Sequence, residues 1–157
     1  MTRLLMVVVI LSGGVALGGA PTTGPATTPT TGPATQPSHF RYLDVHIDPG
    51  GAALAAYQIE IESQTGNMNV VGIEGGEHAA FANPPFHDRI EIIKNRVVIA
   101  AYSLATDLPR WRTRVARIHV EVRGDADPRY TARLIVAGGP GAKPITASVY
   151  LTEGQAP

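Results

Sequence analysis

Hydrophobic and polar residues alternate along most of the chain from His39 onward, and this period of two is the pattern of half-buried β-strands. The clearest runs are YQIEIES at 57–63 and TRVARIHVEVRG at 113–124, in which apolar and polar residues point to opposite faces. The residues that we expect to face a core are, run by run, Leu43, Val45 and Ile47; Tyr57, Ile59 and Ile61; Ala116, Ile118, Val120 and Val122; Tyr130, Ala132, Leu134 and Val136; and Ile145, Ala147, Val149 and Leu151.

Two further runs, MNVVGI at 68–73 and RVVIAAYS at 96–103, are apolar on both faces, so we expect them to be central strands of a sheet. IEII at 90–93 predicts one more short strand. The runs are separated by turn signals, namely DPGG at 48, QTGN at 64, KN at 94, GDADP at 124 and GGPGAKP at 138. Seven to nine strands at this spacing in about 115 residues predict an all-β protein, an antiparallel β-sandwich.

The first twenty residues, MTRLLMVVVILSGGVALGGA, have the pattern of a secretory signal peptide. Arg3 supplies the positive start, residues 4–11 form an apolar run, and small residues follow as a cleavage region. The alternative is an uncleaved anchor, but this apolar run is much shorter than the ~20 residues that span a bilayer. We therefore expect export to the periplasm, the cell surface or the medium, with membrane attachment only if residues 1–20 stay uncleaved.

Residues 21–38 predict a disordered linker, because TTGPATTP is followed by TTGPATQP and proline falls at every fourth position. Such a Thr/Pro/Gly-rich segment cannot bury apolar area and forms a semi-stiff spacer. The folded domain then occupies residues 39–157, enough for a single core. It carries 12 of the 13 Lys and Arg residues and all 13 Asp and Glu residues, a balance that does not favour nucleic-acid binding. The chain has no cysteine, so no disulfide framework is expected.

The order LAAYQIEIES, MNVVGIEGGEHAAF, RVVIAAYS and TRVARIHVEV resembles a cohesin-type domain over roughly residues 42–152. The resemblance implies a jelly-roll sandwich of about nine strands, related in fold to cellulose-binding modules. It also implies docking of a partner module, the calcium-loaded dockerin, on one sheet face. The chain departs from the cohesin pattern where QTGNMNV replaces the usual Y-D-P-x-x-L turn. No duplicated calcium-loop segment is present, so a dockerin-like partner has to be another protein.

The stretch VVGIEGGEHAAFANPPFHD at 70–88 contains imidazole and carboxylate groups, which are competent zinc ligands. The candidate metal ligands are His78, His87 and Asp88, with Glu77 as the alternative carboxylate. Their spacing matches no helical or knuckle motif, so we favour a second interpretation, in which the stretch is a loop. In that interpretation Gly75 and Gly76 turn the chain, and Phe81 and Phe86 pack onto the sandwich edge.

Other motifs give no sign of catalysis. Pro128 stands where the calcium loop suggested by GDADP needs its third ligand, and AGGPGAKP at 137–144 lacks the spacing of a phosphate-binding loop. No G-x-S-x-G elbow is present. The sequence therefore predicts a protein that is not an enzyme and needs no cofactor.

LPRWRTR at 108–114 places Trp111, the only tryptophan, between Arg110 and Arg112. An exposed tryptophan flanked by arginine is typical of a protein-binding hot spot or a sugar-stacking platform. Because tryptophan is buried in most proteins, we favour a second interpretation, a core tryptophan that caps the end of the sandwich with the arginines extending around it. Arg117 and His119, on the polar face of the next strand, complete the candidate binding residues.

The outward polar residues of these strands could form a flat sheet face of mixed charge. Such a face suits docking to another protein better than binding of a small molecule, which needs a concave pocket. We therefore expect a non-catalytic module that docks on another exported protein, dockerin-like if the resemblance holds. One alternative is a carbohydrate-binding module that stacks polysaccharide on exposed aromatic residues. Another, from a different class, is a metal-dependent hydrolase.

Overall fold

The computed structural model describes residues 37–65, 68–88, 95–124 and 127–155, which lie in one compact unit. Within them are eight strands and two 3-10 helices: β1 (Ser38–Asp48), β2 (Ala56–Ser63), β3 (Asn69–Gly75), η1 (Ala79–Phe81), β4 (Phe86–His87), β5 (Arg96–Tyr102), β6 (Thr113–Arg123), β7 (Tyr130–Gly138), η2 (Pro140–Ala142) and β8 (Ser148–Gln155). The all-β prediction is confirmed. The predicted signal peptide, most of the predicted linker and the strand expected at 90–93 lie outside the described residues.

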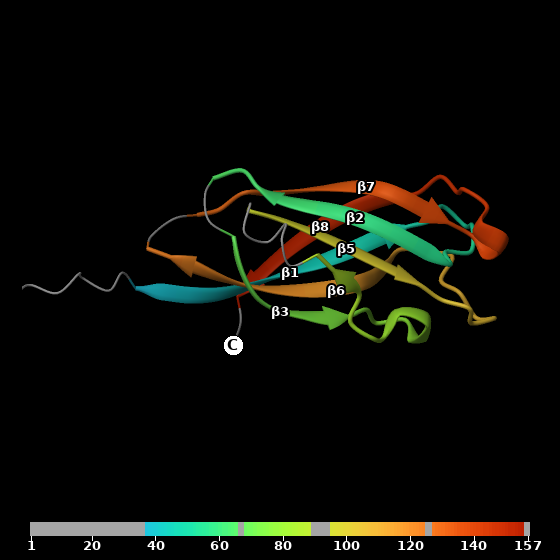
Figure 1. The fold of residues 1–157 in the computed structure, drawn as a ribbon, viewed down its shortest axis with the longest axis horizontal. Helices are drawn as coiled ribbons and strands as arrows, with labels where there is room; N and C mark the ends of the chain where they lie inside the picture. The colour runs from blue at the N-terminus through green and yellow to red at the C-terminus, as the bar shows by residue number, and fades with distance from the viewer. Residues whose placement is uncertain (1–36, 66–67, 89–94, 125–126, 156–157) are drawn as a thin grey trace, which may run out of the picture. The chain divides into compact units, whose positions relative to one another are not determined.

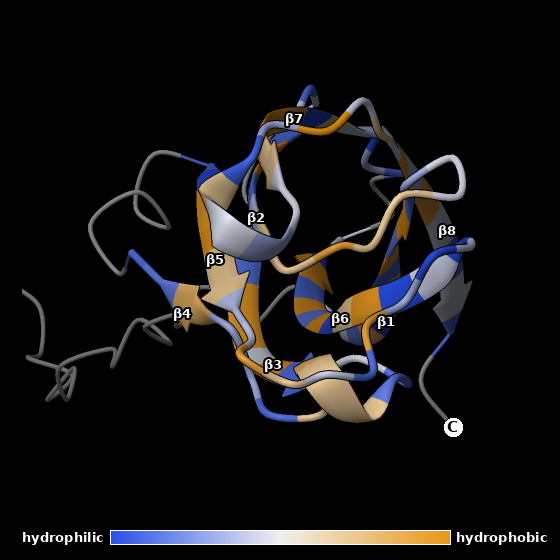
Figure 2. Cartoon of the chain, turned by 90° about the vertical axis from the view of Figure 1, so that its right-hand side faces the viewer, coloured by the Kyte–Doolittle hydropathy of each residue, from blue (hydrophilic) through white to orange (hydrophobic). Residues whose placement is uncertain are grey.

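The strands form two antiparallel sheets of four, in the orders β3-β6-β1-β8 and β4-β5-β2-β7 (Figure 1). Hydrophobic and hydrophilic positions alternate along the strands, as Figure 2 shows in a view along them. The inward residues of both sheets join in one buried cluster, which includes Leu43, Val45, Ile47, Tyr57, Ile59, Ile61, Val97, Ile99, Ile118 and Val120. The two sheets therefore share a single core, in a sandwich-like arrangement.

Tyr57 ties the two sheets together inside this core. Its hydroxyl on β2 donates a hydrogen bond to the carbonyl oxygen of Val115 on β6, at 3.1 Å. Its ring meets Phe81 edge-on, with ring centroids 5.2 Å apart. Burial raises the pKa of Tyr57, so its hydroxyl keeps the proton that it donates.

The prediction that MNVVGI forms a central strand is wrong. β3 is the edge strand of its sheet, and Val71 is 52% exposed there. β5 has only the two-residue β4 outside it, so it lies close to the edge of the other sheet. An apolar run describes which side chains a strand carries, and strand order is decided by pairing with distant segments.

The prediction for β7 holds for most of the strand and fails at Val136. Ile59 pairs with Leu134 and Gln58 with Val136, so Ile135 is an extra residue in the ladder. This β-bulge shifts the alternation by one position. Ala137 consequently packs against the core, and Val136 is exposed.

The strands alternate in direction, so the connections between them gather at two opposite ends of the domain (Figure 1). Ser38 and Gln155, the outer ends of β1 and β8, lie at the same end, because Arg41 pairs with Gln155. The opposite end, which we call the loop end, is built by the connections 49–55, 76–85, 103–112 and 139–147. None of the helices in the described residues is long and apolar enough to cross a membrane.

Candidate functional site

The outer face of the β3-β6-β1-β8 sheet carries two of the predicted binding residues, Arg117 and His119, and both are engaged within the face. Arg117 donates to the two carboxylate oxygens of Asp44 at 2.7 and 2.8 Å, and its guanidinium lies 4.2 Å from the centroid of the Tyr42 ring. His119 Nε2 lies 2.8 Å from a carboxylate oxygen of Glu74. These side chains therefore form pairs across neighbouring strands.

Asp44 is the centre of this network. Burial raises its pKa, but the hydrogen bond and positive charge of Arg117, together with Arg114, outweigh burial and hold the pKa below its usual value. The carboxylate is therefore ionised throughout the neutral range.

The outer face of the second sheet has the same character. Glu60 on β2 accepts from Arg96 on β5 at 3.0 Å and from Arg133 on β7 at 2.9 Å. The carboxylate thus connects three neighbouring strands. Both sheet faces satisfy much of their charge internally, which leaves little reason to favour them as docking surfaces.

Trp111 lies at the loop end, in the connection between β5 and β6, and is 74% exposed. The interpretation as a surface tryptophan is therefore right, and the favoured interpretation as a core tryptophan is wrong. A Cβ atom at Gly51 would lie 3.9 Å from two atoms of the indole ring, so the ring stands beside the β1–β2 turn. Gly51 has a φ of +89°, a conformation that favours glycine. The indole thus lies beside a turn whose backbone conformation favours glycine at position 51.

Arg110 and Arg112 flank the indole and differ from the arginines of the sheet faces. Arg110 donates to the carbonyl oxygen of Gly51 at 3.4 Å, and the guanidinium of Arg112 lies 4.8 Å from the Tyr150 ring centroid. All three residues of the Arg-Trp-Arg sequence line one hollow of about 470 Å³. Of the five predicted binding residues, the structure brings Arg110, Trp111 and Arg112 together around this hollow, whereas Arg117 and His119 lie on a sheet face and do not line it.

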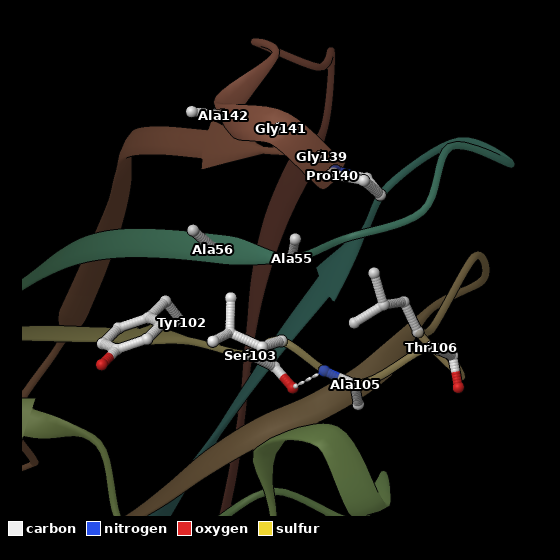
Figure 3. Close-up of a pocket in the computed structure, with 12 residues that line it drawn as sticks. Ala55, Ala56, Tyr102, Ser103, Ala105, Thr106, Gly139, Pro140, Gly141 and Ala142 are labelled. Carbon is white, nitrogen blue, oxygen red and sulfur yellow. Dashed lines mark hydrogen bonds between the residues drawn. The ribbon is translucent and has the colours of Figure 1, made fainter.

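A larger groove of about 560 Å³ lies beside the end of β5. Figure 3 shows Ala55 and Ala56 between the chain from Tyr102 to Thr106 and the turn at Gly139–Ala142. Tyr102 is 77% exposed and Leu104, which also lines the groove, is 91% exposed. Tyr102 is the only lining residue with a titratable side chain, so the groove is predominantly apolar.

Hydrogen bonds hold both walls of the groove. The Ser103 backbone N–H donates to the Ala55 carbonyl at 2.7 Å, and the Ser103 hydroxyl accepts from the Ala105 N–H at 3.2 Å. Across the groove, the Gly139 N–H donates to the Lys143 carbonyl at 2.8 Å and closes the turn that contains η2. The groove is therefore formed between hydrogen-bonded segments that are distant in sequence.

Sequence reasoning missed this groove. It treated AGGPGAKP only as a connection and assigned no role to Tyr102 or Leu104. A local signal did exist, since Leu104 follows a strand and stands among polar and small residues, where a large apolar side chain lacks an obvious core position. That signal could mark Leu104 as exposed, but it could not place Ala55 and Pro140 opposite it.

The loop at 76–85 agrees with the sequence prediction in part. β3 ends at Gly75 as expected, and Phe81 is buried against the core. Phe86, which was expected to pack on the sandwich edge, is instead 78% exposed. β4 is the edge strand of its sheet, and in the described residues its two positions pair only with β5. Phe86 and Tyr102 both line a smaller hollow of about 220 Å³.

The candidate metal ligands do not converge. His78 Nδ1 accepts from the Ala80 N–H at 3.2 Å and so caps η1, while its Nε2 lies 4.0 Å from Asp107. His87 lies on β4 opposite Ile99, and Asp88 follows it. In the described part of the chain, no three His, Cys, Asp or Glu side chains are grouped to hold a metal ion.

Comparison with known proteins adds no relative. No protein-family model, curated protein or solved structure matches the chain. The structure itself defines the fold class, an all-β protein with two four-stranded antiparallel sheets. The cohesin-type resemblance rests on the sequence pattern alone.

Proposed function

We propose that the protein is an exported, non-catalytic module of the cohesin-like jelly-roll type that docks on another exported protein through its loop end. Export is supported by the signal-peptide pattern of residues 1–20, and the jelly-roll assignment by the sequence pattern together with the two sheets. Cohesin-type docking uses a sheet face, so the choice of the loop end departs from the resemblance.

The observation that carries this proposal is a row of apolar side chains that line adjoining hollows of the loop end. Tyr102 lines both the groove and the hollow beside Phe86, and Leu108 lines both the groove and the hollow beside Trp111. Because each hollow shares a residue with the next, Phe86, Tyr102, Leu104, Leu108 and Trp111 form one surface, which we call the apolar band. Contiguous exposed apolar surface of this kind marks interaction sites, and buried aromatic anchors dominate their affinity.

The sheet faces compare poorly as docking surfaces. A partner that covered Asp44 or Glu60 would remove water from charges that are already paired and would gain little in return. A partner that covered Leu104 would bury an almost fully exposed aliphatic side chain, worth about 2 kcal/mol.

The non-catalytic assignment is supported by the chemistry of the groove. Of its lining residues, only Tyr102 has a titratable side chain, and the others are aliphatic, small or hydroxyl-bearing. General acid–base catalysis needs positioned titratable groups of suitable pKa, and covalent catalysis needs an activated nucleophile. Docking of an apolar partner needs neither.

The proposal is tested by site-specific photo-crosslinking of the full chain in the cell that produces it. A photoreactive phenylalanine derivative replaces Leu104 in one variant and Phe40, an exposed residue of β1 at the opposite end, in a control. We expect one discrete protein adduct in the exported fraction from position 104 and none from position 40. Addition of Tyr102→Ala should abolish that adduct. Equal adducts at both positions, or no adduct at position 104, would overturn the proposal.

A further inference from the structure

The arginines of the sheet faces and those beside Trp111 differ in their partners. In the described residues, six arginines form ion pairs with carboxylates: Arg41, Arg96, Arg114, Arg117, Arg123 and Arg133. Arg110 and Arg112 have no such carboxylate partner within that part of the chain. The same is true of Arg129, which lies at the opposite end of the domain. Two positive charges without a carboxylate partner therefore flank the only tryptophan.

We propose that the hollow beside Trp111 binds an acidic saccharide, with a sugar ring stacked on the indole and its carboxylate bound by Arg110 and Arg112. This site goes beyond the proposed docking on a protein partner: it shares Leu108 and Trp111 with the apolar band, but it adds Arg110 and Arg112 and does not use the groove beside Tyr102. The hollow has about 470 Å³, within the range of small-ligand sites, and it is open to solvent beside the exposed indole.

The lining of the hollow matches a sugar ring, which has apolar C–H faces and polar hydroxyl groups around its edge. Trp111 and Leu108 offer apolar surface, which suits the C–H face of a pyranose. His78 and Asp107 stand around the same hollow and carry hydrogen-bonding groups that suit ring hydroxyls. A flat apolar platform with polar groups around it favours a hydroxylated ring over a purely apolar ligand.

Two carboxylates and two arginines line the hollow, and it is the arginines that are available to an anion. Glu77 already accepts hydrogen bonds from the Arg114 N–H at 2.9 Å and the Thr113 hydroxyl at 3.1 Å. Asp107 lies 4.0 Å from His78 and is almost fully exposed. Arg110 and Arg112 keep guanidinium N–H groups available, and this fork geometry matches a carboxylate. The stack of Arg112 on Tyr150 holds its guanidinium in place without using those N–H groups.

An acidic peptide would also satisfy the two arginines, so the ring is what distinguishes the saccharide. Stacking on an indole needs a ligand with a flat apolar face of ring size, which an aspartate or glutamate side chain lacks. We therefore assign the indole to the sugar ring and the arginines to its carboxylate. A polyglutamate peptide is the matched comparison, because it carries the charge without the ring.

The test uses the emission of Trp111, which reports this site alone because the chain has no other tryptophan. The full chain is titrated with trigalacturonate, with uncharged galactotriose and with a short polyglutamate peptide. We expect a saturable change in emission with trigalacturonate and at least about tenfold weaker binding of both comparison ligands. The Arg110→Gln/Arg112→Gln variant should lose about tenfold in affinity for trigalacturonate, and Arg129→Gln should lose none.

Tyr102→Ala should leave trigalacturonate binding unchanged, which separates this site from the protein-docking groove. Absence of an emission change with trigalacturonate would overturn the proposal. Equal binding of polyglutamate would replace the saccharide with an acidic peptide as ligand. Undiminished binding by the Arg110→Gln/Arg112→Gln variant would remove the assigned role of the arginines.

Discussion

The outer faces of the sheets and the loop end are both exposed to solvent, yet their side chains are arranged in opposite ways. On the sheet faces, charged residues satisfy one another across strands, as Asp44 does with Arg117. At the loop end, Leu104 and Trp111 extend into solvent, and Arg110 has no carboxylate partner in the described part of the chain. The sheet faces therefore contribute to the fold, while the loop end keeps surface available for a ligand or partner.

At the loop end, the backbone and the exposed side chains contribute differently to stability. Its backbone is held by hydrogen bonds such as that from the Leu54 N–H to the Pro109 carbonyl, at 2.9 Å. The side chains of Leu104 and Trp111 are exposed, so they add little to stability. If this distinction is correct, substitutions should affect folding or binding according to which of the two they change.

The largest effect on folding is expected where the loop-end backbone is most closely packed. A Cβ atom at Gly75 would lie 2.0 Å from the carbonyl oxygen of Ala82, so Gly75→Ala forces the backbone of the 76–85 connection to move. We expect a loss of about 3 kcal/mol in the free energy of unfolding, measured by urea denaturation.

Gly141→Ala is the matched control, because Gly141 has a φ of +68° but nothing within 4 Å of its Cβ position. Only the backbone conformation opposes this substitution, so we expect a smaller loss of about 1 kcal/mol. Equal losses in the two variants would show that close packing at Gly75 is not what fixes the connection.

An intermediate effect is expected from Asp44→Asn on the sheet face. The substitution removes the charge that binds Arg117 and Arg114, and we expect a loss of about 2 kcal/mol at pH 7. The pKa of Asp44 is lower in the folded protein than in the unfolded chain. Its contribution is therefore full above the unfolded value of about 3.9 and is lost as the pH falls through the native value. Urea denaturation should show that the difference in free energy of unfolding between the wild-type protein and Asp44→Asn is largest at pH 7 and shrinks as the pH decreases below 4.

Asp127→Asn removes the carboxylate of an ion pair that is exposed to solvent, for comparison with Asp44. Asp127 pairs with Arg41 at 2.7 Å, but its side chain is mostly in solvent. Such a pair contributes about 0.5 kcal/mol or less. A loss as large as that of Asp44→Asn would contradict the distinction between the half-buried network of the sheet face and ordinary surface charge.

The smallest effect on folding is expected at the apolar band. Leu104→Ser changes a side chain with almost no contacts to lose, so the free energy of unfolding should change by less than about 0.5 kcal/mol. Ile59→Val, which removes one buried methylene from the core, should cost about 1 kcal/mol in the same assay. If Leu104→Ser proved more destabilising than Ile59→Val, Leu104 would belong to the packing of the fold and not to a free surface.

Sequence alone predicted the buried faces well, because alternation reports burial directly at positions such as Ile59 and Val120. It could not predict the order of the strands, so it placed β3 wrongly at the centre of a sheet. It also could not predict the bulge that turns Val136 outward. Both depend on which distant segment lies alongside the strand.

The candidate site was predicted less completely. The Arg-Trp-Arg sequence was found because its residues are neighbours in the chain, but the exposure of Trp111 depends on the loops around it. The partner of Arg117 lies 73 positions away, at Asp44, so an engaged arginine could not be distinguished from an available one without the structure. The groove was missed for the same reason, since its walls come from three separate connections.

The pairing of Arg41 with Gln155 brings the two ends of the folded domain onto neighbouring strands. The chain thus enters and leaves at one place, on the side opposite the loop end. A domain with this arrangement can be inserted into a surface loop of another protein, or joined in tandem, without disturbance to its core. In each such arrangement the four connections of the loop end would face away from the points of attachment.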